Sequence, residues 1–252
     1  MAKDIIIGID AGTSILKVVA FTLYGKEIAS SSIKNIYKTS HGGQATQSLD
    51  TTWKNCIKII SELKNKINNF KDRVAIISVT GQGDGTWLID KKGKPVCDAW
   101  LWLDSRSSDI AKKLSKLNSE KLRFDLTGTG IFAGQQSSQI SYMDKNNPEI
   151  LDQSSTAFHC KDWIYFKLTN VRATDPSEAC FTFGNFRTRQ YDENVIDGLG
   201  LTKRALNRSL SNDLATQLTL EDKLQTAAGR TYDYNEGVAA FLEKRKPKFK
   251  GE

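Results

Sequence analysis

The fold is decided near the N-terminus, by the stretch Asp4-Ile5-Ile6-Ile7-Gly8-Ile9-Asp10-Ala11-Gly12-Thr13-Ser14-Ile15-Leu16-Lys17. A β-branched run ends at Asp10, a turn with Gly12 follows, and the chain continues into a second apolar run, which predicts a β-hairpin with a carboxylate at its mouth. Gly12 would let the backbone approach a phosphate, Thr13 and Ser14 would offer donors, and Asp10 would hold a divalent cation. An ordinary turn explains the same residues, and the spacing alone does not separate the two readings.

The elements that follow the hairpin indicate an α/β domain. Residues 27–33 alternate polar and apolar side chains, which predicts a third strand. Asp50 or Thr51 is expected to cap a helix that runs to about residue 67, with one apolar stripe. Residues 73–80 are almost continuously apolar, as expected for a central strand covered on both faces. The order β-β-β-α-β predicts a ribonuclease-H-like (actin-like ATPase) domain with a mixed sheet.

A glycine-dense loop, Thr80-Gly81-Gln82-Gly83-Asp84-Gly85, follows the fourth strand. Ligands of such sheets bind beyond the carboxyl ends of strands, so Gln82 and Asp84 are placed to bond substrate hydroxyls. A plain hairpin turn is the alternative. Residues 96–103 predict a further strand, after which Asp104 is expected to cap a helix from Ser107 to about Leu117. Arg106 is better placed than most residues to contact a ligand.

Composition narrows the class of protein. With 252 residues and 39% hydrophobic content the chain can build a real core. The net charge of +7 is spread along the chain, which argues against a nucleic-acid partner. No apolar run reaches membrane-spanning length and no signal sequence opens the chain, so no membrane partner and a cytoplasmic location are expected. The four cysteines and two histidines are scattered, which predicts free thiols rather than a zinc site.

The remaining chain is mainly helical in pattern. Residues 159–169 predict a helix whose aromatic side chains are buried, and residues 173–179 form a polar turn that either starts a helix or closes over a pocket. The sequence changes character near Leu201. One helix is predicted from about residue 202 to 218, and another from about Tyr232 to Arg245.

Four motifs in order resemble the N-terminal half of the FGGY carbohydrate kinases: Gly8-Ile9-Asp10-Ala11-Gly12-Thr13 with Lys17, Thr80 to Gly85, Trp102 to Arg106, and Ala173 to Ala179. Within that family, Gly81 to Trp87, His159 to Trp163 and Phe183 to Arg189 are similar to erythritol kinases. The resemblance covers residues 4–200. It implies phosphorylation of a sugar or polyol hydroxyl by ATP with Mg²⁺.

The same resemblance implies roles for named residues. It places Asp10 at the magnesium ion, and Asp10, Gly12, Thr13 and Lys17 on the nucleotide side. It places Gln82, Gly83, Asp84 and Arg106 in the polyol pocket. In the family a second actin-like domain supplies the catalytic-base aspartate, in a Gly-Asp-x-x-Ala context that this chain lacks. No catalytic residue is therefore assigned, and phosphotransfer by this chain alone is expected to be very slow.

The C-terminal stretch resembles a different family. Residues 236–249, with 220–225 upstream, look like the C-terminus of enoyl-CoA hydratase/isomerase (crotonase) proteins, where this helical end packs in subunit assembly. We therefore expect a kinase-like domain over residues 1–200 and a short helical tail over residues 201–252, with homo-oligomerisation left open. The alternatives to a complete or truncated kinase are a non-catalytic polyol- or nucleotide-binding module and a CoA-related fusion that assembles through its tail.

Overall fold

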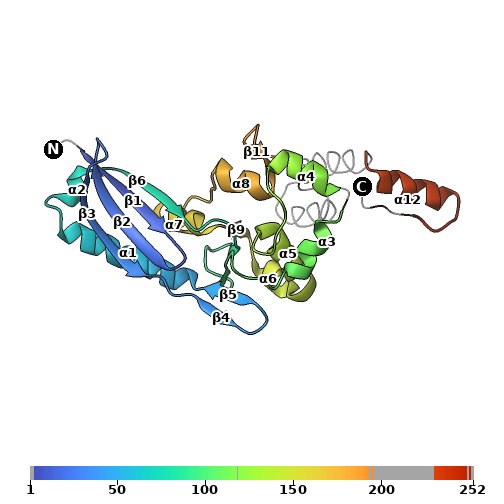
Figure 1. Ribbon diagram of the computed structural model, residues 1–252, viewed down its shortest axis with the longest axis horizontal. Helices are drawn as coiled ribbons and strands as arrows, with labels where there is room; N and C mark the ends of the chain where they lie inside the picture. The colour runs from blue at the N-terminus through green and yellow to red at the C-terminus, as the bar shows by residue number, and fades with distance from the viewer. Residues whose placement is uncertain (1–2, 118, 193–194, 196–229, 249, 251–252) are drawn as a thin grey trace. The chain divides into compact units, whose positions relative to one another are not determined.

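Residues 3–117, 119–192, 195, 230–248 and 250 are described in the computed structural model (Figure 1). The chain divides into two units. Unit 1 comprises Met1–Lys112 and Ile131–Glu178, and unit 2 comprises Lys113–Gly130 and Ala179–Glu252. Every predicted site residue belongs to unit 1.

The main sheet of unit 1 has four strands in the order β3-β2-β1-β6. Strands β1 (Ile5–Ala11), β2 (Ile15–Thr22) and β3 (Glu27–Lys34) form an antiparallel meander, and β6 (Val74–Gly81) pairs parallel with β1. The predicted hairpin, the third strand and the mixed sheet are therefore confirmed.

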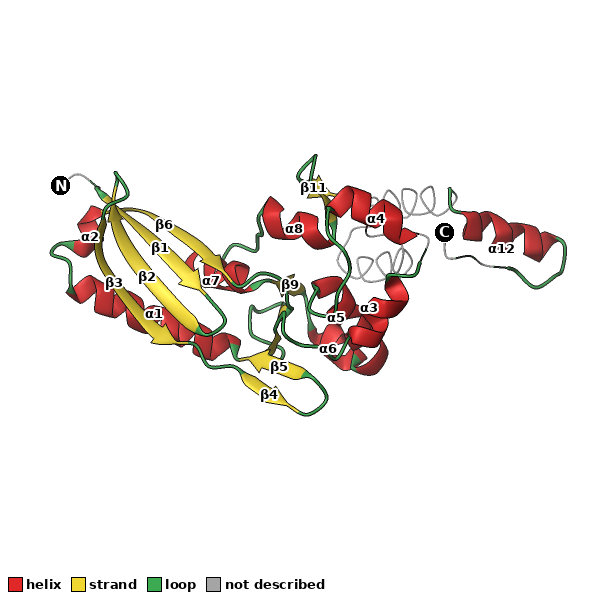
Figure 2. Cartoon of the chain, viewed as in Figure 1, coloured by secondary structure: helices red, strands yellow, loops and turns green. Residues whose placement is uncertain are grey.

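Helix α1 (Leu49–Asn65) covers one face of this sheet, lying along β2 and β3 (Figure 2). The alternating side chains of Ile5, Ile7 and Ile9 are at most 1% exposed, as expected for a strand with one buried face. The helix is capped by Ser48, whose hydroxyl accepts the Thr51 backbone N–H at 3.2 Å. The cap predicted at Asp50 or Thr51 is wrong by two or three residues.

Strand β6 is not a central strand among the described residues. It pairs only with β1 there, so it forms an edge of the sheet. The side chains of Ile76 and Ile77 are 57% and 47% exposed. An apolar run therefore identified the strand correctly but not its position, because apolar composition says nothing about which neighbours are present.

The rest of unit 1 is built from short elements. Strands β4 (Lys38–Ser40), β5 (Gln44–Gln47) and β8 (Ala99–Trp100) form one small sheet, and β7 (Trp87–Ile89) pairs with β9 (Thr156–Phe158). The helices are α2 (Phe70–Arg73), α5 (Gln136–Asn146), α6 (Pro148–Gln153) and α7 (Cys160–Thr169). The strand expected over residues 96–103 is only two residues long.

Two helices run from unit 1 into unit 2: α3 (Ser108–Leu114) and α8 (Pro176–Thr182). Asp104 does not cap α3 as expected. Its buried carboxylate instead accepts the Ala45 backbone N–H at 2.9 Å. Residues 173–179 do lead into a helix, which was one of the two alternatives left open.

Unit 2 contains α4 (Ser119–Thr127), the short pair β10 (Gly184–Asn185) and β11 (Gln190–Tyr191), and α12 (Tyr232–Leu242). The helix predicted near Tyr232 is confirmed, although it ends three residues before Arg245. The helix predicted over residues 202–218 lies outside the described residues. Across the described chain, no helix has the length and apolar character to cross a membrane. None of the four cysteines forms a disulfide, in agreement with the prediction of thiols.

Candidate functional site

The mouth of the first hairpin carries an open carboxylate and an open ammonium group. Asp10, near the end of β1, faces Lys17 of β2 and Thr80 of β6 in the strand register. Directly opposed residues share one face of a sheet, so these three side chains project together, away from the face that α1 covers. All three are exposed. No hydrogen bond or ion pair to another described residue engages Asp10 or Lys17, so a carboxylate and an ammonium group are free to meet a metal-bound phosphate.

Gly12 is required by the turn itself. A Cβ at this position would lie 2.7 Å from the Ile15 carbonyl oxygen, which is too close for any side chain. The Gly12 carbonyl also accepts a hydrogen bond from the Asn35 amide at 2.9 Å. The ordinary-turn reading therefore accounts for this glycine, and its phosphate role stays a prediction.

Thr13 joins the hairpin to the loop after β6. Its hydroxyl donates to Gln82 Oε1 at 3.0 Å and accepts from Trp102 Nε1 at 3.1 Å. The Gln82 amide in turn donates to Gln47 Oε1 at 2.7 Å. The structure thus brings two predicted site residues together, Thr13 and Gln82, and engages both with protein partners.

Asp84 lies in the loop after β6, which turns through two successive left-handed residues. The backbone φ is +53° at Asp84 and +74° at Gly85, a conformation that Asp-Gly sequences favour. Burial and the neighbouring Glu178 carboxylate raise the pKa of Asp84 to about 6, against the opposing effect of His159. A perturbed carboxyl at the end of a sheet strand is a candidate for ligand binding.

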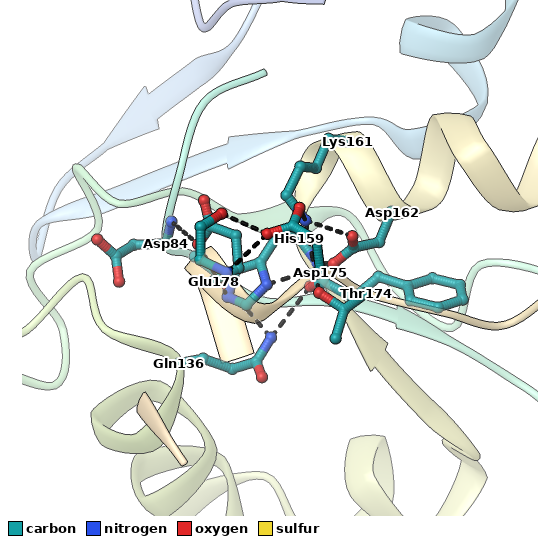
Figure 3. A network of polar contacts seen from close by, with 11 residues as sticks. Asp84, Gln136, His159, Lys161, Asp162, Thr174, Asp175 and Glu178 are labelled. Atoms are coloured by element: carbon teal, nitrogen blue, oxygen red, sulfur yellow. Dashed lines mark hydrogen bonds and ion pairs between the residues drawn. The ribbon is translucent and has the colours of Figure 1, made fainter. Parts of the chain in front are cut away.

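Glu178 and His159 complete a polar network around Asp84 (Figure 3). Glu178 Oε2 accepts the Asp84 backbone N–H at 3.4 Å and lies 3.7 Å from His159 Nε2. His159 Nδ1 lies 3.4 Å from Asp162 Oδ2. All four residues belong to unit 1.

Lys161 forms ion pairs with two carboxylates of this network. Its ammonium group lies 2.5 Å from Asp162 and 2.8 Å from Asp175. Burial alone would raise the pKa values of both carboxyls, but hydrogen bonds from His159 and Lys161 lower that of Asp162. Hydrogen bonds from Lys161 and Ser177 lower that of Asp175 to about 2. The Lys161 charge is therefore balanced locally.

Arg106 is engaged with protein groups. Its Nε and Nη2 donate to the Asp104 carboxylate at 3.0 and 2.6 Å, and its guanidinium carbon lies 3.2 Å from the centre of the Trp100 ring. A bidentate carboxylate and an aromatic face hold this side chain firmly. Its contact with a polyol stays a prediction.

Sequence reasoning did not select His159, Asp162 or Glu178 as site residues. Glu178 was contained in the motif Ala173 to Ala179, and Asp162 follows His159 by three residues at the start of α7, a helix-capping spacing. Neither the motif nor the capping spacing predicts a contact with Asp84, which is far away in the sequence. Within the described ranges no group of three or more histidine, cysteine or acidic side chains could hold a metal ion.

Comparison with known proteins gives one family. The N-terminal domain of the FGGY family of carbohydrate kinases matches residues 5–229. The chain is 54% identical over 201 residues to an erythritol kinase of Brucella abortus (strain 2308), covering 80% of this chain and 39% of that protein. It is 30% identical over 213 residues to a glycerol kinase of Aquifex aeolicus (strain VF5), covering 81% of this chain and 42% of that protein.

Solved structures show the same fold. A xylulose kinase from Rhodospirillum rubrum superposes with a TM-score of 0.72 at 21% identity, covering 77% of this chain and 40% of that one. Plasmodium falciparum glycerol kinase with ADP superposes with a TM-score of 0.68 at 23% identity, covering 78% of this chain and 40% of that one. The predicted ribonuclease-H-like fold is confirmed. The chain spans well under half the length of these relatives.

Proposed function

Because the chain belongs to the FGGY family of carbohydrate kinases, we propose that it provides the polyol site of an ATP-dependent kinase acting on erythritol or a closely similar polyol. One observation carries the proposal: the buried, polar surroundings of Asp84 at the end of β6, in the same unit as the open Asp10–Lys17 pair. Similarity to erythritol, xylulose and glycerol kinases supports a small polyhydroxylated substrate.

Nucleotide binding is proposed for the hairpin mouth. Asp10 would hold Mg²⁺, while Lys17 and the Gly12–Thr13 backbone would face the phosphates; the metal would neutralise phosphate charge during transfer. The exposed carboxylate and ammonium groups fit this assignment. The relative crystallised with ADP supports the class of cofactor.

Binding of polyol is proposed for Gln82, Gly83, Asp84 and Arg106, with no catalytic base assigned among the described residues. A carboxylate accepts hydrogen bonds from hydroxyls and would orient the polyol. The Gly-Asp-x-x-Ala context of the family's base is absent from this chain. We therefore expect phosphotransfer by the chain alone to be very slow.

Calorimetry and a coupled assay test the proposal together. Purified chain would be titrated with erythritol, glycerol and Mg-ADP, and ADP formation from ATP would be followed with and without erythritol. We expect erythritol to bind more tightly than glycerol and any turnover to require erythritol and Mg²⁺. Binding without turnover would favour a non-catalytic module, whereas no binding of any polyol would contradict the proposal.

For the tail we propose a boundary near residue 200, a crotonase-like C-terminus and a role in self-association. The change in sequence character at Leu201 supports the boundary, and exposed Tyr234, Val238 and Leu242 on α12 support association. Sedimentation of the chain and of its Val238→Lys variant would test the proposed self-association.

We also propose a cytoplasmic location.

A further inference from the structure

Resting on the proposed polyol site, we propose that Glu178 determines specificity in that site. Its carboxylate fills the space above Gly83, which has no side chain, and presents Oε1 to a polyol hydroxyl beside the one that Asp84 binds. His159 acts as a positioning residue for this carboxylate. The site would consequently favour polyols over ketoses of the same length.

Gly83 supplies the first observation. Its φ lies outside the left-handed range, so its backbone does not require glycine. The three atoms nearest to a Cβ built at this position all belong to the Glu178 carboxyl group: Oε1 at 3.0 Å, Cδ at 3.7 Å and Oε2 at 3.8 Å. A side chain at position 83 would therefore press on the Glu178 carboxyl group, which would have to shift by a few tenths of an ångström.

His159 supplies an independent observation. Its side chain is only 6% exposed, and its Nε2 has no hydrogen-bond partner among the described residues. That atom points toward Glu178 Oε2, 3.7 Å away, while Asp162 holds the other ring nitrogen (Figure 3). A buried polar atom without a hydrogen bond needs an explanation, and the Glu178 carboxylate is the charged group that faces this nitrogen.

The two oxygens of Glu178 consequently have different surroundings. Oε2 faces the Asp84 backbone N–H and His159. Oε1 lies over Gly83 and accepts no hydrogen bond from a described residue. The side chain is 12% exposed, so it is reachable from solvent. Oε1 is the acceptor left for a ligand.

Two neighbouring carboxylates select for hydrogen-bond donors. An ionised carboxylate only accepts hydrogen bonds, so a hydroxyl satisfies it and a carbonyl oxygen does not. The ammonium group of Lys161 is paired with Asp162 and Asp175, so it does not serve as a donor to a ketose carbonyl. A site that bonds a hydroxyl discriminates strongly against an analogue that lacks it.

Calorimetry on the full chain with erythritol and with erythrulose, a ketose of the same length, tests the inference. Glu178→Gln should weaken erythritol binding about tenfold, because a charged acceptor is lost, and should affect erythrulose much less. His159→Gln should also reduce the preference for erythritol over erythrulose. A general loss of stability would weaken both ligands and would not change this preference. Glu27→Gln, at an exposed position in β3, is the matched control and should change neither affinity.

A double-mutant cycle tests the filled space directly. Gly83→Ala should weaken erythritol binding in the wild-type background, because the new methyl group displaces the carboxylate. In the Glu178→Ala background the same change should have no effect, because the space is empty. Equal effects of Gly83→Ala in both backgrounds would overturn the inference.

The outcomes separate the two proposals. If wild-type chain binds erythritol and Glu178→Gln keeps the same affinity and preference, the specificity role of Glu178 is wrong and the polyol site stands. If wild-type chain binds neither ligand, the polyol site itself is wrong, and the specificity role with it. Circular dichroism of each variant shows whether it is folded.

Discussion

At the scale of single residues, the candidate site places two carboxyl groups next to each other in the folded state. Asp84 is partly buried next to Glu178, and the two carboxyls repel each other when both are ionised. The raised pKa of Asp84 means that its ionised form costs folding free energy at neutral pH. Such a cost is typical of residues kept for binding rather than for stability.

Asp84→Asn is therefore expected to stabilise the fold while removing polyol binding. A shift from 3.8 to about 6 corresponds to ~3 kcal/mol before solvent screening, and because the side chain is partly exposed we expect only about 1 kcal/mol. Urea unfolding at pH 7.5, with calorimetry for erythritol, measures both effects. A variant that is less stable at pH 7.5 would contradict this account.

The pH dependence has a definite sign. The folded state binds the Asp84 proton more tightly than the unfolded state does, so its contribution to stability is greatest below pH 4 and is lost as the pH rises through about 6. The stability difference between wild type and Asp84→Asn should consequently disappear near pH 3.5. Erythritol affinity should fall as the pH drops below about 6, since the ionised carboxylate is the acceptor.

At the scale of elements, turns and side-chain clamps hold the site at the end of the sheet. Thr13 links the β1–β2 hairpin to the loop after β6, and Asp104 links β5 to the segment that carries Arg106. The hairpin is a local feature, and the sequence predicted it closely. The clamps join distant segments, which is why Asp104 was misread as a helix cap.

Gly12→Ala should destabilise the hairpin. The added methyl group would meet the Ile15 carbonyl oxygen at 2.7 Å, and because that atom belongs to the backbone the turn must open. We expect a loss of about 1–3 kcal/mol in unfolding free energy, measured by urea denaturation. Gly130→Ala is the control, since no atom lies within 4 Å of its built Cβ. Equal stability of the two variants would refute the steric account.

Asp104→Ala should cost considerably more than the loss of a surface ion pair. It leaves the Ala45 N–H unsatisfied and Arg106 without its carboxylate, in a place where the Asp104 side chain is 0% exposed. We expect a loss of about 3 kcal/mol. The matched control is Asp98→Ala, whose partner Lys38 is 77% exposed, and it should cost at most about 0.5 kcal/mol. Thermal and urea unfolding compare the two.

At the scale of the whole molecule, the described site residues all lie in unit 1, whereas α12 lies in unit 2. Contacts of Glu236 hold the segment that follows α12 against that helix. Arg245 Nη1 lies 2.6 Å from Glu236 Oε1, and the same oxygen accepts the Lys248 N–H at 2.7 Å. Hydrogen bonds from Arg245 and Lys248 lower the pKa of Glu236 to about 2. These contacts should persist well into the acidic range.

Glu236→Gln should loosen these contacts at the end of α12 without affecting the proposed polyol site. Hydrogen exchange should increase in peptides covering residues 232–248, because the Arg245 contact is lost. Peptides covering residues 80–86 and 159–178 should exchange as before, and erythritol affinity should be unchanged. Glu243→Gln, which removes a more exposed partner of Arg245, should have a smaller effect. Altered exchange around Asp84 would show that the site depends on α12.

The sequence by itself determined the features that depend on neighbouring residues. Two apolar runs set the strands β1 and β2, alternating side chains set β3, the Gly12 turn set the hairpin, and the periodic stripe set α1. These patterns act over a few residues. The loop carrying Gln82 and Asp84 was likewise found at the end of its strand. These parts are sufficient to predict the fold and the place of this loop at the end of a strand.

Only the tertiary structure decided which distant groups meet. Glu178 approaches Asp84 across 94 residues of sequence, and no local pattern encodes that approach. Packing also decided that β6 lies at an edge of the described sheet and that Arg106 is engaged by Asp104 and Trp100. The physical reason is that burial, charge pairing and available space depend on the summed positions of many elements. The Asp10 hairpin could be predicted from the sequence, whereas the contacts of Asp84 with Glu178 exist only in the folded chain.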